Sequence, residues 1–224
     1  IVVTGSRIKR ANNISSPTPM VTLGEDQIEN TGSVNVYDIL NELPQAGDAL
    51  SRGNTNFTVG SSGVQTVNLR GLGSGRTLTL VNGRRWVGGQ PGEGYVDLNS
   101  IPTDLIQKLE VITGGASSVY GSDAIAGVVN YKLRQDVEKT QFSIRASDPL
   151  EGAGEELDFD VIGGYGSFED DGFSVVFAYN RHEQSQLKAT DRTFAETGIL
   201  TITEPNSGNP ALFFNGSRNS IPGN

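Results

Sequence analysis

The pattern of apolar and polar residues changes near residue 136. Before this point, apolar residues occur in short β-branched runs and in one helical stripe, separated by Gly-rich stretches. After it, apolar and polar residues alternate along three longer segments, 139–147, 156–168 and 172–183. A two-residue period is typical of strands with two different faces, whereas the mixed short pattern is typical of an α+β domain. The chain is therefore predicted to contain two parts of different construction.

The first part is predicted to contain one well-defined helix and one hairpin. The helix has apolar residues at the i, i+3, i+4, i+7 spacing, with Ser33 as its predicted N-cap and Pro44 at its end. The dipeptide Asn82-Gly83 lies between two apolar runs, 77–81 and 84–87, which predicts a β-hairpin. The apolar stripe of the helix consists of Val36, Ile39, Leu40 and Leu43. Further strands are expected at 21–23, 64–69, 109–113 and 127–131, and brief helices at 27–29, 102–104 and 116–120.

The stretch LEVITGGASSVYGSDAIAGVVN, residues 109–130, organises this part of the chain. Its pattern predicts a strand, a glycine break, a little over one helical turn and a second strand. Small residues lie where two backbones must approach closely or where φ must be positive. No nucleophile, base or metal-ligand cluster accompanies them, so chemistry alone indicates a tightly packed structural turn. The small residues are Gly114, Gly115, Ala116, Gly121, Ala126 and Gly127.

Composition and charge exclude several classes of function. The net charge is −9, whereas binding to nucleic acid requires a basic face. Residues 1–136 carry 11 basic and 12 acidic side chains, and residues 137–224 carry 6 and 14. There is no Cys, and no apolar run approaches the ~18–20 residues of a transmembrane helix. The glycines at 71, 73 and 75 do not form a phosphate-binding loop, because their spacing is wrong and a strand follows.

An enzyme is not supported by the candidate catalytic residues. Ser185 and Lys188 fit a bare S-x-x-K pattern, but its usual companion motifs are missing. His182 is the only histidine and lies on a predicted strand, so no His-based triad or metal site is expected. Asp158 and Asp160 belong to the polar face of another predicted strand, where carboxylates need no catalytic role. We therefore expect no enzymatic activity and no cofactor.

The stretch 109–130 closely resembles the signature at the end of the plug domain of TonB-dependent outer-membrane receptors. In that family, a strand ending in Glu-Val leads into a Gly-rich turn, then Ser, a Tyr-Gly pair, small residues and a closing Val/Ile-Asn. Many members carry a basic residue before the Gly and a Pro after it, where this chain has Thr113 and Gly115. The matching residues are Glu110-Val111, Gly114, Ser117 or Ser118, Tyr120-Gly121, Ala126-Gly127 and Val129-Asn130.

A second motif resembles the same family and lies at the expected distance before the first. The run LRGLGSGRTLTLVNGRRW, residues 69–86, has the hydrophobic-Arg-Gly segment and the strand into an Asn-Gly hairpin that plug domains share. Two motifs in order are more specific than either alone. Together with the helix that ends at Leu43-Pro44, the resemblance covers about residues 1–135.

The N-terminus is similar to a TonB box, a short segment that adds as a strand to the energy-transducing protein TonB. Val2, Val3, Thr4 and Gly5 match its pattern of hydrophobic residues, Val-Thr and a small residue. Residues 9–19 are polar with two prolines, which predicts a tether that can span at most ~35–40 Å.

The resemblance implies an α+β plug domain, a small mixed sheet with short helices, followed by the first antiparallel strands of a 22-stranded transmembrane β-barrel. Residues 1–19 are then the TonB-box-like segment and tether, 20–136 the plug, and 137–224 the first three barrel strands with a long extracellular loop. Three strands cannot close a barrel. The sequence is thus expected to be the N-terminal portion of a longer receptor in the Gram-negative outer membrane, with the plug and N-terminus facing the periplasm.

In this family a plug gates the import of a scarce nutrient, and TonB drives the transport. The resemblance implies three kinds of partner: the C-terminal domain of TonB at residues 2–5, outer-membrane lipid around the strands, and a ligand above the plug. A ferric siderophore and an oligosaccharide both suit this architecture. We expect plug-to-barrel contacts at Arg70 and Glu110. Ligand contacts are expected among Asn56, Phe57, Arg76, Trp86, Gln90 and Tyr95.

The alternative is a secreted or surface β-rich adhesin or binding module without transport. It would explain the Gly content, the strands and the acidity, but not the two ordered motifs. The acidic run at 169–171 either binds a cation or forms a solvated turn, and the sequence leaves both open.

Overall fold

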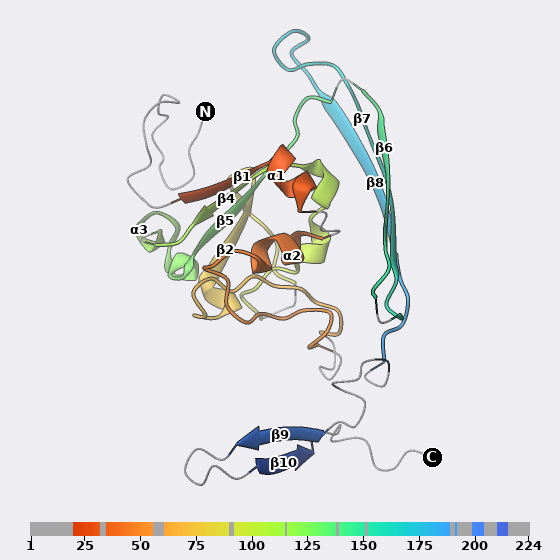
Figure 1. Cartoon of the computed structure of the whole chain (residues 1–224). Coiled ribbons are helices and arrows are strands. Elements are labelled where there is room, and N and C mark those ends of the chain that lie inside the picture. Colours follow the sequence, from red (N-terminus) through yellow and green to blue (C-terminus); the bar gives the residue numbers. More distant parts are fainter. Residues whose placement is uncertain are drawn as a thin grey trace. The chain divides into compact units, whose positions relative to one another are not determined.

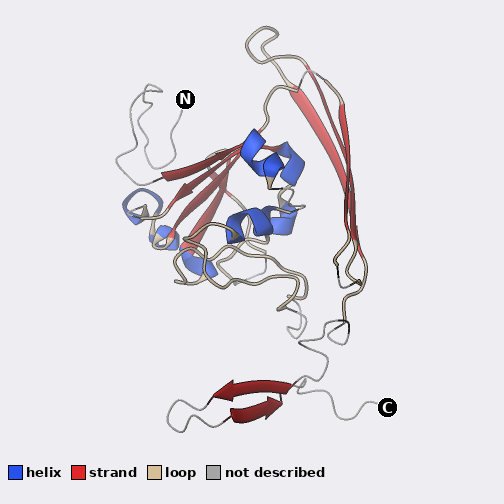
Figure 2. Ribbon diagram, in the orientation of Figure 1, coloured by secondary structure: helices blue, strands red, loops and turns tan. Residues whose placement is uncertain are grey.

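The structure is a computed structural model that describes residues 20–31, 35–55, 61–89, 92–114, 116–137, 139–150, 152–188, 191, 199–203 and 210–214. The described strands form a five-stranded, a three-stranded and a two-stranded sheet (Figures 1 and 2). No helix among these residues is long and apolar enough to cross a membrane.

The five-stranded sheet is mixed, as the resemblance to plug domains implied. Its order is β1-β4-β5-β2-β3, so β1 and β3 are the edge strands. β2 and β5 run parallel, and all other neighbours are antiparallel. The Asn82-Gly83 hairpin is confirmed and joins β2 to β3. The strands are β1 (Met20–Gly24), β2 (Thr77–Val81), β3 (Arg84–Arg85), β4 (Ile106–Ile112) and β5 (Gly127–Leu133).

Two short helices pack on one face of this sheet (Figures 1 and 2). They are α1 (Glu25–Asn30) and α2 (Val36–Asn41). Their buried residues join those of β4 and β5 in the larger core cluster, in which Tyr131 is fully buried. Burial raises the pKa of the Tyr131 hydroxyl well above its usual range. The shared core includes Ile28, Val36, Ile39, Leu40, Leu109, Val111 and Val129.

The N-cap of α2 is Asn35, so the prediction of Ser33 was wrong. Asn35 Oδ1 accepts a hydrogen bond from the Asp38 backbone N–H at 3.0 Å, and Asn35 Nδ2 donates to Asp38 Oδ2 at 2.7 Å. The Asn35 side chain thus caps a free backbone N–H at the start of the helix. The helix begins two residues later than expected. Burial raises the pKa of the Asp38 carboxyl, while the Asn35 hydrogen bond acts in the opposite direction.

The opposite face of the sheet carries a smaller core and the turn that the signature stretch predicted. After β4 the chain forms α3 (Ser117–Tyr120) and the 3-10 turn η4 (Ser122–Ala124) before it enters β5. Gly121 has φ 89° and Gly127 has φ 151°, which confirms the need for glycine at these two positions. The smaller core consists of Leu78, Leu80, Ile112, Ala116, Ala124 and Val128.

Residues 64–69 do not form the predicted strand; they follow an extended path between two loops, with a single bridge from Ala46 to Leu69. Their backbone bonds reach several partners rather than one strand. Thr66 N–H donates to Leu50 O at 3.0 Å, and Gln65 O accepts from Leu98 N–H at 2.8 Å. All six residues are buried. Their alternation of apolar and polar side chains is therefore not that of a strand with one buried and one exposed face.

The three-stranded sheet has the order β6-β7-β8, and its strands are β6 (Gln141–Ser147), β7 (Glu156–Tyr165) and β8 (Val175–Gln184). The predicted alternation is confirmed: on β7, Leu157 is 48% and Phe159 38% exposed, whereas Asp158 and Asp160 are each 2% exposed. The sheet thus has one apolar exposed face. Its large members are Phe142, Ile144, Leu157, Phe159, Tyr165, Val175, Phe177 and Tyr179.

A further hairpin lies where the sequence predicted only a long loop. It consists of β9 (Ile199–Thr203) and β10 (Pro210–Phe214), paired antiparallel with Ile199 opposite Phe214. This segment contains the β-branched residues Ile199 and Ile202 beside Leu200. The nearby Asn, Gly and Pro residues favoured the interpretation of a loop. Three further 3-10 helices lie within the described residues: η1 (Ser74–Arg76), η2 (Leu98–Ser100) and η3 (Thr103–Leu105).

Candidate functional site

Two segments far apart in sequence meet beside the five-stranded sheet, and Asn99 joins them. Asn99 Nδ2 donates to Gly63 O at 3.0 Å, and Arg52 Nη2 donates to Asn99 Oδ1 at 3.3 Å. Asp97 Oδ1 accepts from the Asn99 N–H at 3.1 Å and from the Gln65 N–H at 3.3 Å. These bonds hold the loop that contains Arg52 against the loop that precedes β4. The pair of loops is the candidate ligand surface.

Three predicted ligand residues lie on or next to these loops. Trp86 is half-buried against the larger core, and its Nε1 donates to Ser100 Oγ at 2.9 Å. Tyr95 is half-buried, and its carbonyl accepts from the Gly89 N–H at 2.9 Å. Arg76 is exposed, and its Nη1 donates to Leu72 O at 3.0 Å. Gly75 and Gly94 lie close together, since a Cβ on Gly94 would be 3.5 Å from Gly75 Cα, and this brings the segment of Arg76 next to that of Tyr95. Asn56, Phe57 and Gln90 lie outside the described residues.

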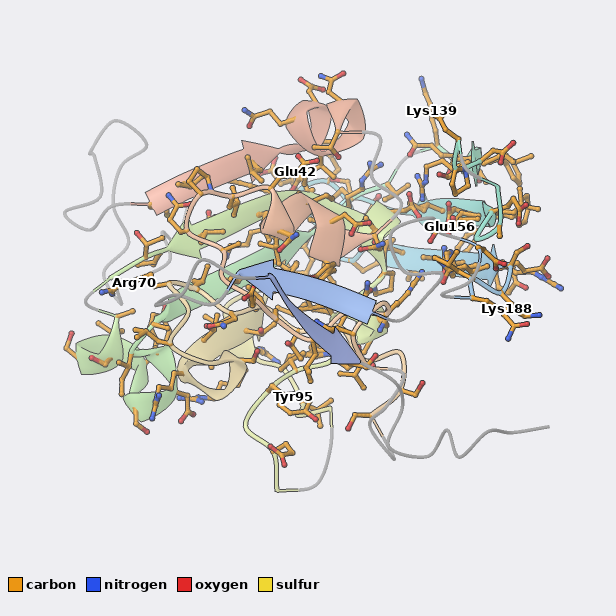
Figure 3. The ribbon with its side chains drawn as sticks, turned by 60° about the horizontal axis from the view of Figure 1, so that its bottom comes forward. Glu42, Arg70, Tyr95, Lys139, Glu156 and Lys188 are labelled. Atoms are coloured by element: carbon orange, nitrogen blue, oxygen red, sulfur yellow. The ribbon has the colours of Figure 1, made fainter. Side chains whose placement is uncertain are left out.

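Arg70 lies well apart from Tyr95 (Figure 3). Its side chain is exposed and its φ is 59°, a backbone conformation that few residues other than glycine adopt. Its Nη1 reaches Thr113 O at the end of β4, at 3.4 Å. An exposed guanidinium held beside the end of β4 is suited to an ion pair with another part of the receptor. A plug-to-barrel contact at Arg70 remains a proposal.

Glu110 lies inside the sheet, which its sequence position did not reveal. The residue is 2% exposed; its Oε1 lies 2.9 Å from Lys108 Nζ, and its Oε2 accepts from Asn130 Nδ2 at 3.3 Å. Asn130 Oδ1 in turn accepts from the Gly83 N–H at 2.9 Å. The carboxylate therefore links β4 and β5 to the β2–β3 hairpin. A carboxylate this buried is not accessible to the wall of a barrel, so the structure does not support a plug-to-barrel contact at Glu110.

The polar face of the three-stranded sheet carries a row of polar pairs between β7 and β8, in which only Asp158 and Asp160 are buried. Asp158 Oδ1 lies 2.9 Å from His182 Nδ1, and Glu156 Oε1 accepts from Gln184 Nε2 at 2.6 Å. Asn180 Nδ2 donates to Asp160 Oδ1. These pairs stabilise the sheet without forming a catalytic arrangement. Within the described residues, no group of His, Cys, Asp and Glu side chains is suited to a metal ion.

The contacts that build the candidate site have no local signature in the sequence. Arg52 and Asn99 are 47 residues apart, and Asn130 and Glu110 are 20 apart. The register of β4 and β5 places Glu110 opposite Asn130, whereas the Arg52–Asn99 contact depends on how two loops pack together. The residues predicted for TonB binding, Val2, Val3, Thr4 and Gly5, lie outside the described residues.

Comparison with known protein families shows to which family this chain belongs. The family model described as the TonB-dependent Receptor Plug Domain matches residues 12–128, more than half of the chain. The chain belongs to the TonB-dependent receptors. The mixed sheet with its short helices is the plug of such a receptor, and the antiparallel strands that follow are the first strands of its barrel.

Solved receptors of this kind have the same fold. One is a mutant of the ferric enterobactin receptor PfeA from Pseudomonas aeruginosa in complex with enterobactin, with a TM-score of 0.59 and 23% identity over 83% of this chain. Another is the unliganded ferric citrate transporter FecA, with a TM-score of 0.58 and 20% identity over 75% of this chain. The matches cover 27% and 26% of those receptors, so this chain spans about a quarter of their length.

Proposed function

We propose that the receptor to which this chain belongs imports a scarce nutrient across the Gram-negative outer membrane and that TonB drives the transport. The observation that carries the proposal is the plug fold directly followed by strands with one apolar exposed face. Such a face suits outer-membrane lipid, and the plug and N-terminus would then face the periplasm. An adhesin would need the strands but not the plug.

The proposed substrate is a ferric siderophore. Solved proteins of the same fold are described as a ferric enterobactin receptor and a ferric citrate transporter, which supports this class. An oligosaccharide is the second candidate, because Trp86 and Tyr95 offer aromatic rings and the joined loops offer amide groups such as Asn99. In either case the ligand would contact the plug at Arg76, Trp86 and Tyr95, with Asn56, Phe57 and Gln90 as further proposed contacts.

TonB is the proposed partner at Val2, Val3, Thr4 and Gly5. These residues precede the tether, and the tether leads directly to β1, an edge strand of the plug sheet. A strand added by TonB to residues 2–5 would therefore act on β1 first.

The substrate proposal predicts how the host regulates the receptor. We expect its abundance to rise under iron starvation and to stay unchanged when a complex glycan is the only carbon source. Quantitative mass spectrometry of outer membranes measures this abundance. Induction by the glycan alone would replace the siderophore with an oligosaccharide, and Trp86→Ala and Tyr95→Ala would then be the first variants to test for lost binding.

A further inference from the structure

Arg134, the first residue after β5, joins two segments of the plug to β6, the first strand after it. Its Nη2 lies 2.7 Å from Glu25 Oε1 at the start of α1, and its Nη1 donates to Gln141 Oε1 of β6 at 2.8 Å. Its backbone N–H donates to Leu105 O at 2.8 Å. The side chain of Arg134 is only 14% exposed, so this arrangement is more shielded from solvent than an ordinary surface ion pair.

The segment on which Arg134 lies is itself fixed to the turn between β7 and β8. Asp136 Oδ1 accepts from the Phe168 N–H at 3.1 Å, and Gln135 O accepts from Ser174 Oγ. Val137 is 6% exposed. Residues 134–137 therefore form an anchored point, and the ion pair attaches α1 to it.

The elements between the tether and this point are weakly held. β1 has five residues, and β4 is its only strand partner in the part of the chain that the structure describes. α1 has six residues, too few for a helix to be stable without outside contacts. Its buried residue in the larger core is Ile28. The Glu25–Arg134 pair is thus a principal attachment of α1.

We propose that Arg134 acts as a retaining point: when the N-terminal segment is drawn away from the plug, β1 separates while Arg134 holds α1 and the rest of the plug in place. This role depends on the proposed function in one respect, namely that TonB supplies the force on the N-terminal segment. It makes Arg134 a positioning residue that sets how much of the plug opens during transport.

The test is a pulling measurement on the full-length receptor in a supported bilayer, with constant force applied to the N-terminus. Two successive steps are expected, release of β1 and then of α1, each extending the chain by at most ~3.3–3.6 Å per released residue. Arg134→Gln should shorten the lifetime of the second step about tenfold and leave the first unchanged. An unchanged second step, or equal shortening of both, would overturn the proposal.

Matched variants separate the ion pair from a loss of charge or of general stability. Arg84→Gln removes an exposed arginine on β3 and should change neither lifetime. Glu25→Gln should reproduce the effect of Arg134→Gln, and the double variant should be no worse than either single one. Arg134→Lys, which keeps the charge, should recover part of the lifetime. Additive effects of the two single variants would show that the pair does not act as a unit.

The instrument supplies the force, so this result does not depend on TonB. A shortened second step in a receptor that imports nothing would keep the retaining role and remove the proposed function. Normal import by the receptor, with a second step that Arg134→Gln does not shorten, would keep the proposed function and remove the retaining role.

Discussion

Val3→Pro is expected to abolish energised uptake by the full-length receptor and to leave ligand binding at the cell surface unchanged. If residues 2–5 add as a strand to TonB, the main-chain hydrogen bonds of that strand provide most of the contact. Proline removes the donor at residue 3 and restricts φ, so the ladder is interrupted at its centre. The proposed ligand surface lies on other loops, so ligand binding should stay unchanged. Uptake and binding of labelled ligand in the same cells measure both quantities.

The control for this variant is proline in the tether. Asn13→Pro changes the chain in a polar segment that already contains Pro17 and Pro19, and no strand pairing is expected there. It should leave uptake near the level of the unmodified receptor. Normal uptake by Val3→Pro would show that the TonB segment lies elsewhere.

Gly127→Val is expected to destabilise the plug strongly. A Cβ at Gly127 would lie 2.3 Å from Ile112 O and 2.7 Å from Leu69 Cδ1, and the residue has φ 151°. The strain and the clash each cost about 1–3 kcal/mol, so we expect a loss of about 3–5 kcal/mol in the free energy of unfolding. That is a substantial fraction of the ~5–15 kcal/mol that stabilises an ordinary domain.

A second glycine of the same stretch provides the matched comparison. A Cβ at Gly114 would meet nothing within 4 Å, so Gly114→Ala should change stability by less than about 1 kcal/mol. Brief proteolysis of outer-membrane vesicles across a urea series measures the unfolded fraction of the plug for both variants. Equal protease resistance of Gly127→Val and Gly114→Ala would show that close approach at residue 127 does not limit the fold.

The sequence predicted the elements whose signals are local. The Asn82-Gly83 hairpin, the apolar stripe of α2 and the strand–turn–strand stretch around α3 all depend on residues within a few positions of one another. The alternation on β7 also followed directly from the order of its side chains. In each of these cases neighbouring residues alone determine the conformation.

Features that depend on distant partners were not predicted. Residues 64–69 alternate like a strand, but their backbone groups bind two loops, so no ladder forms. Glu110 appeared in the sequence as a residue available for contact, whereas Asn130 and Lys108 enclose it within the sheet. The hydrogen bonds of Asn99 and the Glu25–Arg134 pair join residues whose proximity only the complete topology creates.

The most direct test of the account is uptake of radioactive iron, supplied as ferric siderophores, by cells that contain the full-length receptor, with and without TonB. The account predicts binding in both cells and accumulation only where TonB is present and the inner membrane is energised. Accumulation that is independent of TonB would contradict the central claim. Failure to accumulate any iron chelate, with TonB-dependent uptake of an oligosaccharide instead, would keep the transport mechanism and replace the substrate.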